Sequence, residues 1–365
     1  MFMRFSDVYI CHTFYHVYVA LLMEFNKAYE NQGKSDILLS TMSNDFSSMY
    51  PRLEASGVFN KVYLYEEKEA STFPELEKYR TNKGNLVSNL VQRYKYTKLL
   101  GKLEERFVPT DLTQYDNVFV FCDSDPIGYY LNYKKIHYSA LEDGLNSGRL
   151  DDQARNSNPG HFGLKCFLAG LGFIFIESGY SKYCDHYIVN DISENHLPPK
   201  NIKEQSFSKL CQKLTRKEHD KMVEIFLGED TQLTDTLDVS KYDDETVMVL
   251  TEPLCDLDTR KRIFTDIIKE YAKGCRVIIK PHPRDVLDYE KEFPESIVIR
   301  ERFPMEVMND IDGLRVTKVI SVITQTDCIQ FADKIIYLGL DFLDRYEDPS
   351  IHRKAGSGDK IANLG

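Results

Sequence analysis

Short runs of apolar residues alternate along this chain with longer segments in which apolar residues recur at helical spacing. A run of about four to eight apolar residues predicts a buried strand, and recurrence every three to four residues predicts a helix with one buried face. Their alternation is typical of an α/β protein with parallel sheets. We expect strands at 8–11, 37–40, 61–65, 117–122, 135–139, 187–189, 247–251, 276–280, 297–299, 318–322 and 334–338.

Helices are expected between these strands, and one segment separates two strand–helix units. A turn at 12–16 is expected to lead into a helix through about 27, and further helices are predicted at 75–107, 215–227, 259–273 and 305–310. The segment 146–162, rich in Gly, Asn, Ser and Asp, predicts a loop. The acidic segment 228–245 predicts a linker, so we expect domains at 1–235 and 240–345 and a tail at 346–365.

Composition and charge exclude some classes of protein. The 365 residues are 42% hydrophobic and 28% charged, as in an ordinary globular protein, and this length suits two domains. The net charge is −11, and the longest basic run is Arg260-Lys261-Arg262. A nucleic-acid-binding surface normally shows clustered Lys and Arg, so nucleic acid is not an expected partner.

Cysteine usage and the amino-terminal residues bear on location. The eight cysteines are scattered without a C-x-x-C pair, which is typical of reduced thiols in the cytosol. Residues 1–7 lack the pattern of a signal peptide, and no window approaches 18 apolar residues. We therefore expect a cytoplasmic protein, and peripheral attachment to the inner face of a membrane stays open.

Glu142-Asp143-Gly144 is the first motif with chemical potential, and it ends a predicted strand. A carboxylate there can take a proton from an attacking hydroxyl, while the adjacent acid bonds nearby backbone. Gly144 lets the chain turn without a side chain over the substrate. The alternative interpretation is a plain turn.

Lys280-Pro281-His282-Pro283-Arg284 is the second motif, at the end of another predicted strand. The two prolines restrict the backbone around His282, and a protonated His can donate to a phosphate oxygen. Lys280 and Arg284 add positive charge for an anion. A structural turn with a surface histidine is the alternative.

The third motif is Ser321-Val322-Ile323-Thr324-Gln325-Thr326, between a predicted strand and a predicted helix. Hydroxyl and backbone N–H groups at the start of a helix suit a phosphate. An ordinary Ser/Thr helix cap is the alternative.

Together the three motifs resemble those of bacterial sialyltransferases, which carry a [DE]-[DE]-G motif, an H-P motif and a later Ser/Thr motif. The chain is most similar to the lipooligosaccharide and capsule sialyltransferases of glycosyltransferase family 52. Ile10-Cys11-His12-Thr13-Phe14-Tyr15-His16 and Leu250-Thr251-Glu252-Pro253-Leu254 extend the resemblance, which covers about 8–338. It implies a GT-B fold, in which two Rossmann-like domains with parallel sheets face each other across a cleft.

The resemblance implies roles for residues near the second and third motifs. His282 would bind the phosphate and act as the acid toward departing CMP. Other nucleotide contacts would come from Lys280, Pro283, Arg284, Thr251, Glu252, Pro253, Ser321, Thr324 and Thr326.

The base has more than one candidate. Asp143 fits the [DE]-[DE]-G role, with Glu142 beside it and Gly144 on the acceptor side. Some family members use an Asp in the loop before the H-P strand, where this chain has Leu254-Cys255, so Asp256 and Asp258 are substitutes. We prefer Asp143.

Asp123-Ser124-Asp125 forms a D-x-D sequence, which in other glycosyltransferases binds a divalent ion. Pro126 follows, so we interpret the segment as the start of a helix. CMP-sialic acid has a single phosphate and does not demand a bridging metal. We expect no metal and no cofactor. His12 and His16 could reach the acceptor, or they are satisfied polar residues at a helix start.

The sequence thus predicts an inverting sialyltransferase that moves sialic acid from CMP-sialic acid to a galactose-terminated glycan of a capsule or lipooligosaccharide. One alternative is a transferase of the same fold that uses a UDP-hexose. Another is a non-catalytic nucleotide-binding subunit of a polysaccharide assembly complex. The expected partners are a nucleotide-sugar donor and a glycan acceptor, and the family resemblance leaves a homodimer open.

Overall fold

The computed structural model describes residues 5–28, 33–144, 153–194, 199, 201–228, 237–238, 245–283, 285–324, 326 and 328–353. Contacts divide the chain into two units, Met1–Glu218 and His219–Gly365, with the division inside a helix ahead of the expected linker. Most of that linker, 228–245, lies outside the described residues, as does most of the expected tail beyond Arg353.

The first unit is built around a seven-stranded sheet of order β3-β2-β1-β4-β5-β6-β7, in which every neighbouring pair is parallel. Its strands are β1 (Phe5–Cys11), β2 (Asp36–Ser40), β3 (Lys61–Tyr65), β4 (Tyr115–Val120), β5 (Tyr138–Leu141), β6 (Cys184–Val189) and β7 (Ile202–Glu204). Its helices are α1 (Phe14–Ala28), α2 (Tyr50–Ala55), α3 (Leu86–Glu104), α4 (Pro126–Lys134), α5 (Gln153–Ser157), α6 (Phe162–Gly170), α7 (Phe207–Cys211) and the start of α8 (Arg216–Leu227).

The second unit has a five-stranded parallel sheet of order β10-β9-β8-β11-β12. Its strands are β8 (Thr246–Leu250), β9 (Arg276–Lys280), β10 (Ile297–Val298), β11 (Val316–Ser321) and β12 (Ala332–Tyr337). Its α-helices include α10 (Leu257–Tyr271), α11 (Tyr289–Glu292) and α12 (Pro349–Arg353), with 3₁₀ turns η6 (Met305–Asp310) and η7 (Leu340–Arg345). The expected α/β class with parallel sheets is confirmed in both units.

Each sheet starts at an inner strand and winds outward in both directions, as in Rossmann-like folds. The winding reverses between β1 and β4 in the first unit and between β8 and β11 in the second. Ligands of such sheets bind beyond the carboxyl ends of the strands at this reversal. The loops after β1, β4, β8 and β11 are therefore the places to look for chemistry.

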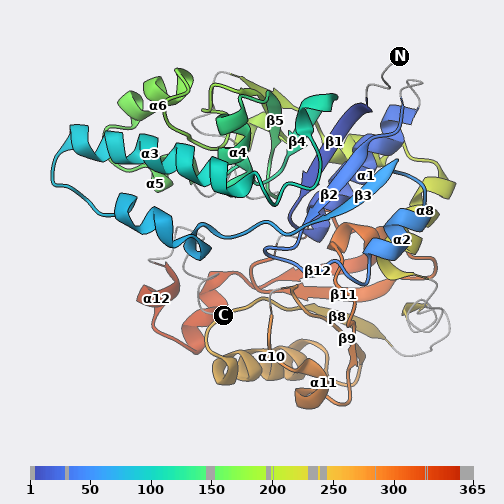
Figure 1. Cartoon of the computed structure of the whole chain (residues 1–365). Helices are drawn as coiled ribbons and strands as arrows, with labels where there is room; N and C mark the ends of the chain where they lie inside the picture. Colours follow the sequence, from blue (N-terminus) through green and yellow to red (C-terminus); the bar gives the residue numbers. More distant parts are fainter. Residues whose placement is uncertain are drawn as a thin grey trace. The chain divides into compact units, whose positions relative to one another are not determined.

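The core strands are apolar because they are covered on both faces. Val8, Ile10 and Val120 are fully buried in the first unit, as are Val247 and Ile320 in the second. Figure 1 shows α3 and α4 side by side beside the first sheet. Gly101 of α3 permits this contact, because a Cβ there would lie 2.3 Å from the Tyr129 carbonyl oxygen of α4.

Several predicted boundaries were wrong. The helix expected over 75–107 is interrupted near Gly84, which has a φ of +77°, and α3 begins after the Asn85 cap. The strand expected at 135–139 starts later, because Lys135 adopts a left-handed conformation at the end of α4. β7 was missed: its three residues lack an apolar run.

Within the part of the chain that the structure describes, none of the helices combines the length and apolar character needed to cross a membrane.

Gly101→Ala is expected to destabilise the protein by about 1–3 kcal/mol, because the added methyl group overlaps the backbone of α4. Gly163→Ala in α6 is the matched control, since a Cβ there meets no atom within 4 Å. It should be neutral or slightly stabilising because alanine favours helix. Thermal unfolding measures both, and equal midpoints would contradict the prediction.

Candidate active site

Asp143 is the exposed carboxylate at the carboxyl edge of the first sheet, directly after β5. Its side chain is 45% exposed, and its Oδ1 lies 2.8 Å from His16 Nε2. Cys122 Sγ, after β4, donates to the same oxygen at 3.1 Å. Partial burial acts to raise the pKa of Asp143, but the hydrogen bonds from His16 and Cys122 and the charge of His12 outweigh it and hold that pKa well below its usual range. Asp143 is therefore ionised.

His16 holds this carboxylate through a defined tautomer. Its Nδ1 accepts the backbone N–H groups of His12 at 3.0 Å and Thr13 at 3.2 Å, so the ring proton lies on Nε2. Nε2 donates to Asp143 Oδ1 and approaches its backbone oxygen at 3.0 Å. The ring stacks on Phe121, and burial lowers the pKa of His16, which keeps it neutral.

His12 forms a buried ion pair with Glu67, a residue that the sequence did not single out. His12 Nε2 lies 2.8 Å from Glu67 Oε2 and 3.6 Å from Asp125 Oδ2. Burial alone would lower the pKa of His12, but the Glu67 carboxylate outweighs it and raises that pKa to about 9. Glu67 also accepts from Ser40 Oγ at 2.7 Å and from the Ile127 N–H at 2.8 Å.

The two histidines are thus behind Asp143 instead of on the surface. His12 is 1% exposed and His16 is fully buried. Both side chains are hydrogen-bonded inside the unit, and their contact with an acceptor stays a prediction.

The side chains of Glu142 and Asp143 lie in different surroundings. Glu142 is buried, and its Oε2 accepts the Asn190 N–H at 2.8 Å. Asp143 faces outward. The space where Gly144 would carry a Cβ is open, with no atom within 4 Å.

The D-x-D segment is the start of α4, as expected. Asp123 is 4% exposed, accepts the Tyr138 hydroxyl at 2.9 Å and the Ser178 N–H at 2.9 Å, and burial raises its pKa to about 7. Asp125 is the N-cap residue before Pro126, although its side chain does not bond the helix. Asp123 is turned into the protein, so the pair does not present two carboxylates to one ion.

Among the residues that the structure describes, two groups of side chains could hold a metal. His12, His16 and Cys122 bring ligand atoms within 4.8 Å of one another, as do His12, Glu67 and Asp125. Both ring nitrogens of His16 and the Nε2 of His12 already serve internal hydrogen bonds, whereas the Nδ1 of His12 is buried without a hydrogen-bond partner among the described residues. Metal independence stays a prediction.

His282 follows β9 and is partly exposed between Pro281 and Pro283. Its N–H donates to Thr251 Oγ1 at 3.2 Å, which ties the H-P turn to the loop after β8. Arg284 lies outside the described residues. A cavity of about 180 Å³ adjoins His282 and is also lined by Arg300 and Arg302, two cations that the sequence did not single out.

Lys280 is not placed as expected. Its side chain is buried, its Nζ donates to the Phe303 carbonyl oxygen at 2.9 Å, and the ammonium lies over the Phe303 ring. Burial lowers the pKa of Lys280 to about 8. Lys280 therefore packs inside the unit and contributes no surface charge.

A buried ion pair joins the two loops that the resemblance singled out. Arg260 Nη1 lies 2.6 Å from Asp285 Oδ1, after the H-P turn, and both side chains are almost fully buried. The same guanidinium donates to the carbonyl oxygens of Leu254 at 2.7 Å and Cys255 at 3.0 Å. Thr251, itself 2% exposed, bonds Asp285 Oδ2 at 3.3 Å.

The two substitute bases, Asp256 and Asp258, lie at the start of α10 in the second unit. Asp256 is the N-cap of α10 and accepts the Thr259 N–H at 3.0 Å and its hydroxyl at 2.8 Å. These bonds lower the pKa of Asp256 and give it a structural task. Asp258 lies exposed in the first turn of the same helix.

The N–H and hydroxyl donors of the third motif were predicted to bind a phosphate. In the structure they donate to a carboxylate of the protein itself, that of Glu252. Glu252 Oε1 accepts the N–H groups of Ile323 at 3.1 Å and Thr324 at 2.9 Å, and Ser321 Oγ lies 3.2 Å away. The expected helix is absent from the described residues between β11 and β12. Glu252, 2% exposed, is therefore an internal anchor, and Thr326 is likewise buried. Thr324 and Pro253 stay partly exposed.

Sequence reasoning missed the buried partners, namely Glu67, Arg260 and Asp285. Each is a single charged residue in a loop or helix, and only the fold brings it to its partner. The one available signal was position, because Glu67 follows a predicted strand directly.

Solved structures of bacterial sialyltransferases are similar to this chain in fold. The computed structure superposes on a crystal structure of an α/β-galactoside α-2,3-sialyltransferase from the luminous marine bacterium Photobacterium phosphoreum with a TM-score of 0.53, at 13% identity over 99% of this chain and 94% of that one. The GT-B domain of a sialyltransferase from Photobacterium damselae gives a TM-score of 0.48, at 12% identity over 91% of this chain and 99% of that one.

A segment of 100 residues, 26% of this chain, is 30% identical to an uncharacterized protein of Haemophilus influenzae and spans 32% of that relative. At 13% identity the structural likeness shows the fold alone, which is GT-B. Residues 65–331 match the family described as glycosyltransferase family 52. Since this match covers most of the sequence, the chain belongs to glycosyltransferase family 52.

Proposed function

We propose that this glycosyltransferase is a sialyltransferase that moves sialic acid from CMP-sialic acid to a galactose-terminated glycan, with inversion at the transferred carbon. The observation that carries the proposal is that each unit has a suitable group at the carboxyl edge of its own sheet: the exposed carboxylate of Asp143 in the first unit and the H-P imidazole of His282 in the second. The sialyltransferases with the same fold support it.

In the proposed reaction Asp143 takes the proton of the acceptor hydroxyl as that oxygen attacks the anomeric carbon. His16 and Cys122 hold the carboxylate ionised and oriented before the acceptor arrives. The bond from the anomeric carbon to the phosphate oxygen of CMP breaks, and His282 donates a proton or hydrogen bond to that oxygen. CMP and the elongated glycan leave.

Two alternatives remain as outcomes of the tests below. A UDP-hexose donor would need a second phosphate contact, for which Arg302 beside His282 offers a cation, whereas Arg300 is ion-paired with Glu290 of the same cavity. A non-catalytic nucleotide-binding subunit would not need Asp143 held as an exposed, ionised carboxylate, and the family membership also supports an enzyme.

Calorimetric titration with CMP, UDP and GDP, with and without EDTA, tests the donor. We expect CMP to be the one nucleotide of the three that binds. EDTA should not change its affinity, because one phosphate needs no bridging metal. His282→Ala should weaken CMP binding by about tenfold or more, the worth of a charged hydrogen bond, whereas His137→Ala, an exposed histidine in the first unit, should leave it unchanged. Preference for UDP or GDP, or loss of binding in EDTA, would contradict the proposal.

The pH dependence of transfer tests Asp143. Because its pKa is held below the usual range, native activity should persist to the lowest pH at which the protein stays folded. In His16→Phe the main donor is lost and only Cys122 and the charge of His12 oppose burial, so an acid limb should appear at higher pH than in the native protein, closer to the ordinary Asp value of about 3.9. Asp143→Asn should lower kcat by ~10²–10⁴-fold. Unchanged profiles in His16→Phe, verified as folded by thermal unfolding, together with an active Asp143→Asn would refute the role.

A further inference from the structure

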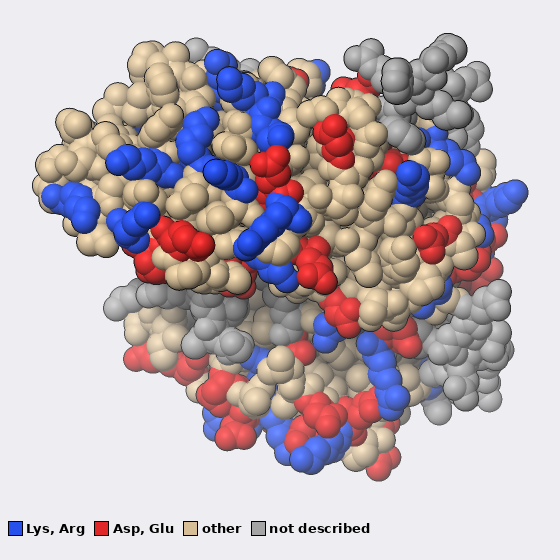
Figure 2. Space-filling view, viewed as in Figure 1, with Lys and Arg blue, Asp and Glu red and all other residues tan. Residues whose placement is uncertain are grey.

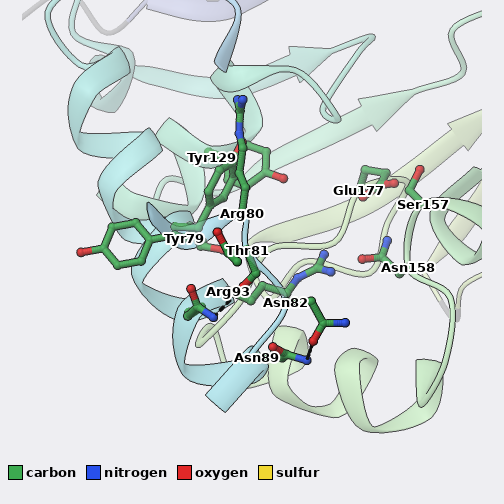
Figure 3. A pocket seen from close by; sticks show the side chains of 13 residues that line it. Tyr79, Arg80, Thr81, Asn82, Asn89, Arg93, Tyr129, Ser157, Asn158 and Glu177 are labelled. Atoms are coloured by element: carbon green, nitrogen blue, oxygen red, sulfur yellow. Dashed lines mark hydrogen bonds between the residues drawn. The ribbon is translucent and has the colours of Figure 1, made fainter. Parts of the chain in front are cut away.

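A polar pocket in the first unit lies apart from Asp143 and has no part in the chemistry described so far. It encloses about 470 Å³ between α3 and the segment before it on one side and the end of α5 with Glu177, ahead of β6, on the other. This volume falls within the range of roughly 300–1,000 Å³ seen for small-molecule sites. Figure 3 shows Arg93 of α3 on one wall and Ser157, Asn158 and Glu177 on the other.

One face of α3 is polar where it meets this pocket. Asn89, Gln92, Arg93, Tyr96 and Thr97 follow the i, i+3, i+4, i+7, i+8 spacing of a single helix face, and all of them line the cavity. A face turned into the protein is normally apolar. Polar residues at every one of these positions indicate a surface built for a ligand.

Three buried acceptor atoms in this pocket lack a hydrogen-bond partner among the described residues. They are Gln92 Oε1, Thr97 Oγ1 and Asn158 Oδ1. Thr97 and Asn158 are each 1% exposed. Buried polar atoms nearly always have a hydrogen-bond partner, so three unsatisfied atoms in one cavity indicate a site for a ligand or ordered water.

The orientation of both amide groups is determined by their neighbours. Gln92 Nε2 donates to the Thr81 carbonyl oxygen at 2.9 Å, and Asn158 Nδ2 donates to the Ala154 carbonyl oxygen at 2.6 Å. The oxygen is therefore the unsatisfied atom in each amide. These two amide oxygens accept hydrogen bonds and the Thr97 hydroxyl can donate or accept one, which suits a ligand rich in hydroxyl groups.

Charge and aromatic content agree with a polyhydroxylated ligand. Glu177 and Arg93 face the same cavity with opposite charges, and the Arg93 guanidinium is held by the Phe175 carbonyl oxygen at 3.0 Å. Tyr79, Tyr96 and Tyr129 supply rings with polar tips, on which the apolar face of a sugar can stack.

The pocket shares α4 with the candidate active site. Tyr129 lines the pocket one helical turn after Asp125, and Ser178, next to Glu177, donates its N–H to Asp123. We propose that this pocket binds saccharide units of the acceptor that are remote from the reacting hydroxyl. The proposal rests on the proposed function only in naming the ligand as an acceptor.

Saturation-transfer NMR with a galactose-terminated tetrasaccharide, lacto-N-neotetraose, tests the pocket without any donor. Ser157→Trp fills the cavity from an exposed position, and Thr97→Val removes one hydroxyl at constant shape. We expect Kd to rise about tenfold in the first variant and about threefold in the second, the worth of one hydrogen bond. Asn156→Trp, exposed on the same helix but outside the lining, is the control.

Absence of binding in the native protein, or an unchanged Kd in both variants, would overturn the pocket assignment. The CMP titration separates the two proposals. Tetrasaccharide binding that depends on Thr97, in a protein that does not bind CMP, would support the pocket and contradict the donor.

A second, independent observation concerns the outer surface of α3 and α6. Val87, Val91 and Tyr94 form one exposed face of α3, and Leu164, Phe167 and Leu171 form an exposed face along α6 and its end. Val87 is 71% exposed and Phe167 63%. The ring of Phe173, after α6, lies 6.3 Å from that of Tyr94 and joins the two faces into one apolar patch.

The charge around this patch differs from that of the chain as a whole. The net charge of the chain is −11, yet residues 86–103 and 162–176 contain no Asp or Glu and include Arg93, Lys95, Lys98, Lys102 and Lys165. Figure 2 shows Lys and Arg gathered over the region of α3. Exposed apolar side chains next to cations are typical of a protein surface that enters the headgroup region of an anionic bilayer.

We infer that the patch formed by α3 and α6 binds an anionic membrane surface. Co-sedimentation with vesicles of phosphatidylethanolamine and phosphatidylglycerol tests this. Binding should fall with added salt and on neutral phosphatidylcholine. Val87→Ser with Phe167→Ser should reduce it about tenfold, whereas Val286→Ser, 66% exposed in the second unit, should not.

Vesicle binding that is equal in all three proteins would overturn this inference. So would light scattering that shows a native dimer which Val87→Ser with Phe167→Ser converts to a monomer, because the patch would then belong to a second copy.

Discussion

The buried carboxylate of Glu67 is the interaction on which the candidate site of the first unit depends. Its two oxygens accept from His12 after β1, from Ser40 at the end of β2 and from the first turn of α4 after β4. A buried charge is tolerated only when paired and hydrogen-bonded, and His12, with a pKa raised to about 9, supplies the opposite charge. The pair thereby fixes the edge of the sheet at which the winding reverses.

The effect reaches Asp143 through the backbone. With His12 held by Glu67, the N–H groups of His12 and Thr13 point at His16 Nδ1 and place the ring proton on Nε2. That proton orients Asp143. An exposed side chain at the end of a strand would otherwise sample several rotamers, so preorganisation here comes from residues that no substrate touches.

The second unit uses the same physical device with different residues. Glu252 accepts backbone N–H groups of the loop after β11. The ion pair of Arg260 with Asp285 connects the loops after β8 and β9. In both units an internal charge satisfies backbone groups that the ends of parallel strands leave open. His282 is consequently presented from a loop anchored on both sides.

Helix α3 shows how one segment can serve three surroundings. One face packs on α4 through Gly101, a second lines the polar pocket, and a third carries exposed Val87 and Val91. The sequence of α3 shows no single apolar stripe, because its apolar residues are distributed over two different faces and its polar residues over a third. This is why its extent was predicted too long and its surfaces were not predicted at all.

Local patterns were enough to predict most of the strands, the α/β class and the motifs that end the strands, because burial on both faces demands continuous apolar runs; they missed β7, which lacks such a run. They also identified Asp143 and His282 as candidates and the helix start at Asp125. Which polar groups meet was decided only by the tertiary structure. Glu67 and His12 are 55 positions apart, and Glu252 is 72 positions from Thr324. Hydrogen bonds are directional and short-ranged, so whether Glu252 or a phosphate uses the N–H of Thr324 depends on loop geometry that no local pattern encodes.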